Sequence, residues 1–484
     1  MDSQKCDGER PSCGPCRRST EQFQDCEYTD SGATQSQILQ EQIAVLESRL
    51  QQLQGQGSSL PPRKPTEDAS AIQLHEPYRS GTSLEDTITP QIKQRLLGIF
   101  IDHALDIGFF LNIDRFANSA LNTLPTERAR NALLNTAYLW ATHLSTLEEL
   151  KHYESFFLKR ALAGISQGLS GTSSPGTSVS RSTDILSVIQ AEYLIAVYYF
   201  RNVKILEGKY HMTTAMSLAI SAGLHTIRSL ESTHLGNSAA LGPPADAIEE
   251  GERITAFWAI LSLNYCWTAI DSSPSNVVPS MRTGLRIDTP WPEDMETYVN
   301  MDIQPHLNAG HTVLRFLTDV SGTYDSGAPL SWRTFYAKAS ILFEQATHIG
   351  SKHWNSTYLA LLEAYPTQSY ADMVSRSPNT ARSSVEFSTL DSLIIRFTQT
   401  MSTIHPATYS PLIQKHLSAA HFLAHIACIR LHYSFVDQQA RSRQRVIDSA
   451  KAATTIITRM DGNSFIGPIT GVSLPYTVFP NTSR

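Results

Sequence analysis

From Pro90 to about residue 470, apolar residues recur with helical spacing in one segment after another. One example is the set Leu417, Ala420, Leu423, Ala424, Ile426 and Ala427. No series of alternating apolar and polar residues indicates β-strands, and no run of 18 apolar residues indicates a membrane-spanning helix. Hydrophobic residues make up 41% of the chain, which is enough for a sizeable core. The sequence therefore predicts a soluble, all-α body over residues 90–470.

Loops rich in Gly, Ser, Thr and Pro separate the expected helices. A first helix begins at Ile92 and stops near Gly108, and the polar run at 168–183 predicts a surface loop, after which Asp184 caps the next helix. The other expected helical segments are Asn131–Leu147, His152–Gly168, Ile185–Phe200, Val203–Gly223, Ile248–Ala269, Ser331–His348, Thr389–Met401, Pro411–Phe435 and Arg443–Met460. The two segments on either side of residues 201–202 predict an α-hairpin.

A different pattern precedes this body, because residues 1–30 contain a run of closely spaced cysteines. The run reads KCDGERPSCGPCRR, and its ligand candidates are Cys6, Cys13, Cys16 and, ten residues after the run's last cysteine, Cys26. It resembles the second half of the fungal Zn2Cys6 binuclear zinc cluster, a DNA-binding module. The resemblance implies that these four residues are the third to sixth ligands of a family pattern that this sequence joins at its third cysteine.

In that family six thiolates hold two zinc ions, whereas four are present here. A structural zinc ion takes four ligands, so these residues can complete at most one site. We therefore expect a partial cluster that is poorly ordered without metal. The segment Cys13-Gly14-Pro15-Cys16 also has the form of a thioredoxin-like redox motif, but no apolar strand flanks it, which disfavours that interpretation.

DNA contacts in the family come from basic residues, and those of residues 1–28 are Lys5, Arg10, Arg17 and Arg18. Six acidic residues in the same segment leave it a net charge of −2, and the whole chain has a net charge of −6. Binding to phosphates requires local positive charge. The sequence therefore predicts weak DNA contact at best from these four residues.

After a short spacer, residues 36–54 carry an apolar seam with alternating steps of four and three. Its members are Leu39, Ile43, Leu46, Leu50 and Leu53. These are heptad a and d positions, and Ile at a with Leu at d favours a parallel two-stranded coiled coil. We expect a homodimer, the alternative being an amphipathic helix that packs on its own domain. Residues 55–89 are rich in Gly, Ser and Pro and predict a linker, and residues 471–484 predict an irregular tail.

Three segments of the helical body resemble the regulatory middle region of fungal Zn2Cys6 factors, the xylanolytic-activator-like domain. They are FIDHALDIGFFLNIDRF at 100–116, residues 190–228, and EEGERITAFWAILSLNYCWTAIDSSPSNV at 249–277. The resemblance implies a nuclear, RNA polymerase II-specific transcription factor, with an inducer pocket possible among the helices. The alternative is a truncated regulatory protein of the same family that dimerises but does not bind DNA.

Several features resemble parts of enzymatic sites, but a structural role fits each of them better. His421 and His425 share a helix face, but Phe422 stands where the metalloprotease motif has glutamate. The acidic cluster Glu249, Glu250 and Glu252 lies near a helix start, where it favours the helix dipole, and Arg253 is a candidate ion-pair partner.

Buried cysteines and aromatic residues complete the set. Cys266 and Cys428 are isolated in apolar helices, where a free cysteine behaves as a small hydrophobe. Phe109, Phe110, Trp258 and Trp267 are expected in the core. We therefore expect no enzymatic activity.

Overall fold

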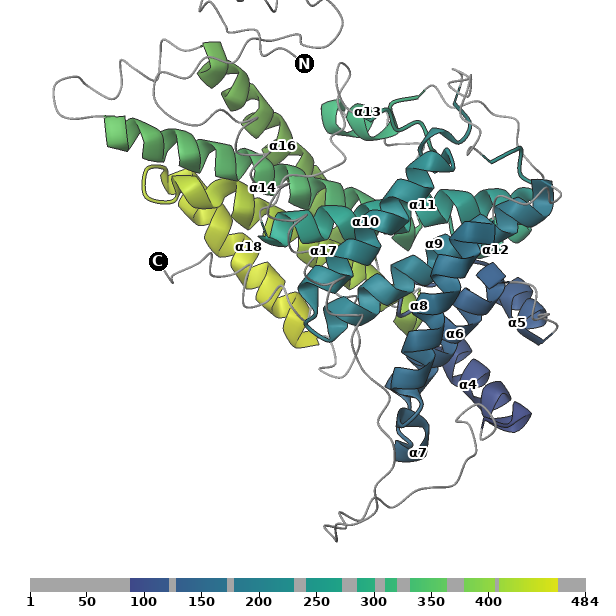
Figure 1. Cartoon of the computed structure of the whole chain (residues 1–484). Coiled ribbons are helices and arrows are strands. Elements are labelled where there is room, and N and C mark those ends of the chain that lie inside the picture. Colours follow the sequence, from purple (N-terminus) through teal and green to yellow (C-terminus); the bar gives the residue numbers. More distant parts are fainter. Residues whose placement is uncertain are drawn as a thin grey trace, which may run out of the picture. The chain divides into compact units, whose positions relative to one another are not determined.

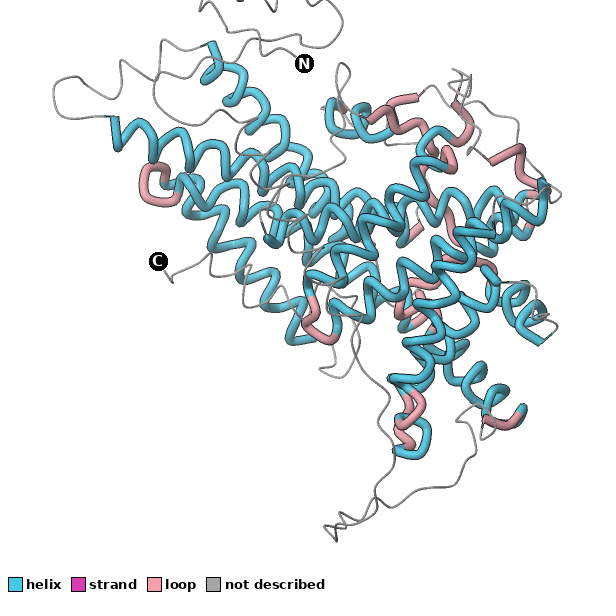
Figure 2. Tube along the Cα trace, in the orientation of Figure 1, coloured by secondary structure: helices cyan, strands magenta, loops and turns pink. Residues whose placement is uncertain are grey.

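The chain divides into two compact units, Met1–Gly81 and Thr82–Arg484, and every residue described below belongs to the second. The computed structural model describes residues 88–121, 128–171, 178–229, 241–271, 285–300, 310–319, 331–363, 378–404 and 409–459. These ranges contain helices and connecting turns but no β-strand, which confirms the all-α prediction (Figure 2). No helix within them is long and apolar enough to cross a membrane. The predicted partial zinc cluster, coiled coil and tail lie outside these ranges, as does the predicted linker up to residue 87.

Figure 1 shows the helices of this unit in chain order. They are α4 (Pro90–His103), α5 (Ile113–Leu121), α6 (Arg128–Leu144), α7 (Glu148–Lys151), α8 (Glu154–Gly171), α9 (Ser178–Arg201), α10 (Ile205–Ser221), α11 (Ala247–Asp271), α12 (Met295–Val299), α13 (Thr312–Thr318), α14 (Trp332–Glu363), α16 (Pro378–Thr403), α17 (Pro411–His432) and α18 (Ala440–Arg459). Two 3₁₀ turns, η1 (Leu224–Thr226) and η4 (Tyr433–Phe435), follow α10 and α17.

Two helix starts use the same local chemistry. The Thr89 hydroxyl accepts a hydrogen bond from the backbone N–H of Ile92 at 3.3 Å, and Pro90 occupies the first helical position of α4. Ser410 and Pro411 repeat this arrangement at the start of α17. A short hydroxyl side chain satisfies a free backbone donor, and proline has no N–H to lose there.

The structure corrects several predicted boundaries; for example, α14 continues to Glu363 rather than ending at His348, and α16 begins at Pro378 rather than at Thr389. The helix α4 ends at His103 rather than near Gly108, because the chain continues in a turn in which the N–H of Phe109 donates to the carbonyl of Ala104 at 2.9 Å. Gly108 closes this turn with a positive φ of 85°. A Cβ at this position would lie 2.6 Å from the Tyr193 hydroxyl oxygen, so glycine is required there twice over.

The predicted loop between α8 and α9 is shorter than expected. Helix α8 continues to Gly171 and α9 already begins at Ser178, so Asp184 lies inside α9 and its predicted capping role is wrong. Ser and Thr disfavour a helix only slightly, by about 0.5 kcal/mol each, and packing of the apolar part of α9 outweighs that cost. The predicted hairpin is confirmed, since α9 and α10 pack against each other across the turn at 202–204.

Helix α11 is the centre of the packing. It is buried along almost its whole length, from Ala247 to Ala269. Beyond the charged residues of its first turns it is apolar on nearly every face, as expected for a buried helix. It contacts α9, α10 and α12 as well as α14, and α14 in turn packs along α17 (Figure 1). The ring of Trp267 stacks on that of Phe200 at 3.9 Å, which joins α11 to α9. Residues far apart in the sequence are therefore brought to the two sides of α11.

Candidate functional site

A cavity of about 80 Å³ lies beside α11. Its walls come from the turn after α4, from α9, α11, α14 and α17, and from Pro292 before α12. The polar residues that line it are Asp106, Tyr193, Thr255, Ser262, Arg333, Tyr336 and His416, and its apolar lining includes Leu105, Trp258, Leu263, Trp332 and Leu423. Six segments that are distant in the sequence thus meet at one cavity lined by both polar and apolar side chains.

Arg333 carries the positive charge of this cavity. It is the second residue of α14, and its guanidinium carbon lies 4.5 Å from the centre of the Trp332 ring. Its Nε is buried and has no hydrogen-bond partner among the described residues. Burial lowers the pKa of Arg333, and the charge of Asp294 opposes that effect. The Asp294 carboxylate does not pair directly with Arg333; it accepts a hydrogen bond from the Ser331 hydroxyl at 2.8 Å.

His416 faces the same space from α17. Its ring stacks on Trp332 with centroids 4.1 Å apart and an interplanar angle of 18°. Burial, together with the nearby charge of Arg333, lowers the pKa of His416 to about 3, so the imidazole is neutral near pH 7. The Nε2 atom of His416 and the hydroxyl oxygen of Thr255 are buried, and each lacks a hydrogen-bond partner in the described part of the chain.

The acidic residue of the lining is compensated within the protein. Asp106 follows α4, and its Oδ1 lies 2.7 Å from the Nζ of Lys415 on α17. This pair is largely shielded from solvent, with side-chain exposures of 22% and 14%. The charge that remains in the cavity without a direct counter-ion is therefore that of Arg333.

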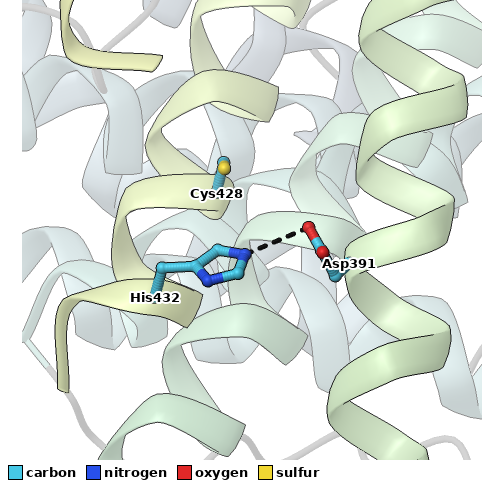
Figure 3. Close-up of side chains that lie close together, drawn as sticks. All are labelled: Asp391, Cys428 and His432. Atoms are coloured by element: carbon cyan, nitrogen blue, oxygen red, sulfur yellow. Dashed lines mark hydrogen bonds and ion pairs between the residues drawn. The ribbon is translucent and has the colours of Figure 1, made fainter. Parts of the chain in front are cut away.

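A second polar group lies where α16, α17 and α18 meet (Figure 3). Asp391, Cys428 and His432 are all buried, and one ligand atom from each lies within 4.8 Å of the others. The group could hold a metal ion. In Figure 3 the His432 ring points toward the Asp391 carboxylate, and its Nε2 lies 3.0 Å from Oδ1.

The partners of this group favour an ion-pair network over a metal centre. The same Oδ1 of Asp391 accepts a hydrogen bond from Arg445 of α18 at 2.8 Å, and Nδ1 of His432 lies 3.0 Å from the Ser442 hydroxyl. Burial raises the pKa of Asp391, but the hydrogen bonds from His432 and Arg445 outweigh it, so the pKa is below its ordinary value. Burial raises the pKa of the Cys428 thiol. A metal would have to deprotonate that thiol and displace two hydrogen bonds.

The acidic cluster at the start of α11 has structural partners, including the expected ion pair. Arg253 Nη2 lies 2.6 Å from Glu249 Oε1, and Glu250 binds the guanidinium of Arg228 through both oxygens at 2.8 Å. Glu249 also accepts a hydrogen bond from the N–H of Ala245 at 2.9 Å, while its own N–H donates to Asp246 at 2.8 Å. This reciprocal pattern is a variant of the capping box and fixes the start of α11.

Glu252 has a different environment from its two neighbours. Its Oε1 accepts a hydrogen bond from the N–H of Asn112 at 2.8 Å, and only 9% of the residue is exposed. Burial raises the pKa of Glu252 to about 7, with the hydrogen bond from Asn112 and the charge of Arg115 opposing the rise. Glu252 and Arg115 both line a second cavity, of about 290 Å³.

His421 and His425 of α17 lie side by side, with their Nε2 atoms 3.1 Å apart. Burial lowers the pKa of both, to about 4 for His425, so neutral imidazoles share one hydrogen bond. Cys266 and Cys428 are 0% and 1% exposed, which confirms that both are buried. The four aromatic residues expected in the core are also buried: Phe109, Phe110, Trp258 and Trp267.

The predicted zinc ligands, DNA-contact residues and dimerisation residues all precede residue 88 and lie outside the described ranges. The sequence did not single out Arg333, His416, Thr255 or Asp391, since each stands in a helix whose apolar pattern identifies only its buried face. No protein-family model, curated protein or solved structure matches the chain.

Proposed function

We propose that this chain is a zinc-dependent, DNA-binding transcription factor of the Zn2Cys6 class, nuclear and RNA polymerase II-specific, whose all-α body regulates it. The observation that carries the proposal is the cysteine run KCDGERPSCGPCRR, with a heptad seam after it and an all-α body beyond. A zinc module, a dimer element and a helical regulatory body in this order form a coherent DNA-binding regulator. We assign the all-α body a regulatory role rather than a catalytic one.

The zinc ion in this proposal is held by Cys6, Cys13, Cys16 and Cys26, with Lys5, Arg10, Arg17 and Arg18 on DNA. Four thiolates complete one tetrahedral shell, so the chain holds one zinc ion rather than two. The buried group Asp391, Cys428 and His432 is the alternative metal site. Replacing one cysteine of each group shows which of the two holds zinc.

Zinc content of the purified full chain tests this assignment. We expect one zinc ion per chain by elemental analysis, lost in Cys13→Ser and retained in Cys428→Ser, because a shell of three thiolates is incomplete. The two variants are matched, since each replaces one thiol by a hydroxyl. Retention of zinc in Cys13→Ser, or its loss in Cys428→Ser, would place the metal in the helical body and overturn the assignment.

A second candidate function is a regulatory partner that dimerises but does not bind DNA. The net charge of −2 over residues 1–28 favours it, because phosphate binding needs positive charge. Selection of bound duplexes from a random-sequence pool, followed by a mobility shift with and without zinc, separates the two. A sequence-specific complex that a chelator abolishes supports the transcription factor. Failure to enrich any sequence supports the regulatory partner.

A further inference from the structure

Three residues that line one cavity each carry a buried polar atom without a hydrogen-bond partner. The atoms are the hydroxyl oxygen of Thr255 on α11, Nε of Arg333 on α14 and Nε2 of His416 on α17, and none has a partner among the described residues. Buried polar groups are almost always paired in folded proteins, because an unpaired one keeps the cost of losing water. Because these three residues come from three helices around one hollow, a molecule bound there would supply partners for their polar groups.

The charge of the cavity determines the class of that molecule. Two other buried or half-buried arginines of the described residues have carboxylate partners: Arg253 pairs with Glu249, and Arg228 pairs with Glu250. No carboxylate of the described residues lies within ion-pair distance of Arg333, and the acid in the lining, Asp106, is neutralised by Lys415. A guanidinium fork of this kind binds a carboxylate through two parallel hydrogen bonds. The bound molecule is therefore an anion.

The size and walls of the cavity restrict the anion further. A volume of about 80 Å³ corresponds to roughly five to eight water molecules at 10–15 Å³ each. Aromatic and aliphatic side chains, among them Trp258, Leu263 and Leu423, form much of the wall. A phosphate dianion would be costly to transfer into such walls beside a single cation. A monocarboxylate with a small aromatic or branched body satisfies both the charge and the walls.

The charges around Arg333 favour binding of an anion inside the cavity rather than in the hollow next to it. A neighbouring hollow of about 430 Å³ shares Leu105, Trp332 and Arg333 with the cavity, but Asp294 and Glu296 line that hollow. Like charges repel a carboxylate there, so the anion is directed to the cavity side of Arg333. The neutral His416 can donate from Nε2 to the second carboxylate oxygen.

We propose that the cavity between α11, α14 and α17 binds a small aromatic or branched monocarboxylate, held by Arg333, His416 and Thr255. That the bound acid acts as an effector rests on the proposed function. Binding itself does not, because neither zinc nor DNA takes part in it.

Calorimetric titration of the full chain tests the proposal. The ligands are acetate, benzoate, phenylacetate and 1-naphthoate, with phenylacetamide as the neutral isostere of phenylacetate. We expect one site per chain that prefers benzoate or phenylacetate, at least tenfold weaker binding of the amide, and a roughly 10- to 100-fold loss of affinity in Arg333→Met. Unliganded Arg333→Met should melt no lower than the parent chain, because the substitution removes a charge whose burial no ion pair offsets.

Arg115→Met is the matched control, since Arg115 lines a different cavity and pairs with Asp246 at 2.7 Å. It should leave the affinity for phenylacetate unchanged. Thr255→Val tests a second residue of the cavity, and we expect it to lower the affinity for phenylacetate several-fold. Equal binding of acid and amide, equal affinities of the two arginine variants, or no binding by any of the acids would overturn the proposal. A chain that binds phenylacetate but neither zinc nor DNA would refute the proposed function and leave the cavity assignment standing.

Discussion

Glu252 shows how burial of one residue makes stability depend on pH. Its pKa is about 7 in the folded chain, against an ordinary value of 4.5, and burial is the main cause. Asp246 and Glu249 add to the rise, while Asn112 and Arg115 oppose it. Between these two values the folded state binds more protons at this site than the unfolded state. Stability therefore falls as pH rises through this window, by about 3 kcal/mol in all for a shift of this size.

Glu252→Gln removes this titration and keeps an oxygen that accepts the hydrogen bond from Asn112. We expect its free energy of unfolding to exceed that of the parent chain by about 2–3 kcal/mol near pH 8, and by less than about 1 kcal/mol near pH 5. Urea unfolding across this range measures both. Glu148→Gln is the control, because Glu148 is 78% exposed, and it should leave the pH profile unchanged. Parallel profiles for the Glu252→Gln variant and the parent would contradict a raised pKa.

At the level of helices, the packing of α14 on α17 depends on one small residue. A Cβ at Gly350 would lie 2.5 Å from the carbonyl oxygen of Arg430, which is backbone and cannot rotate away. Gly350→Ala should therefore destabilise the chain by about 1–3 kcal/mol, the usual range for overpacking. Thermal or urea unfolding measures the loss, and a separation of the two helices would accompany it.

Gly98 offers the opposite case within a helix. It lies in the middle of α4, and nothing lies within 4 Å of where its Cβ would stand. Gly98→Ala should raise stability by about 0.5–1 kcal/mol, because alanine loses less conformational freedom in a helix. The two substitutions are chemically identical, so only packing can give them opposite signs. Stabilisation by both would show that α14 and α17 do not approach so closely at Gly350.

Helices such as α11 and α17 were predictable because their apolar patterns are local. The start of α9 was not, since weakly helical Ser and Thr residues become helical only when the rest of the helix packs. The cavity was not predictable for a further reason. Arg333, His416 and Thr255 stand in three helices, and nothing in their spacing shows that tertiary packing brings them together. The same holds for Asp391, which reaches Cys428 and His432 only through the packing of α16 on α17.

At the level of the whole chain, the predicted seam at 36–54 belongs to the first compact unit and the helical body to the second. The seam is shorter than three heptads, and so short a coiled coil is marginal by itself. We therefore expect a dimer that dissociates on dilution rather than a permanent one. A parallel arrangement would place the two cysteine runs side by side, which is the geometry needed to bind two DNA half-sites.

Sedimentation of the full chain over a concentration series tests this expectation. The parent should shift from dimer to monomer on dilution, whereas Leu46→Lys with Leu50→Lys should be monomeric throughout, because two like charges would face each other at each seam position. Ser48→Lys adds the same charge on the outer face of the helix and should leave the dimer intact. A dimer that survives the double substitution must be held by the body instead. In that case two half-sites would be spaced by helix packing, and a carboxylate bound beside α11 would act directly on the unit that sets their separation.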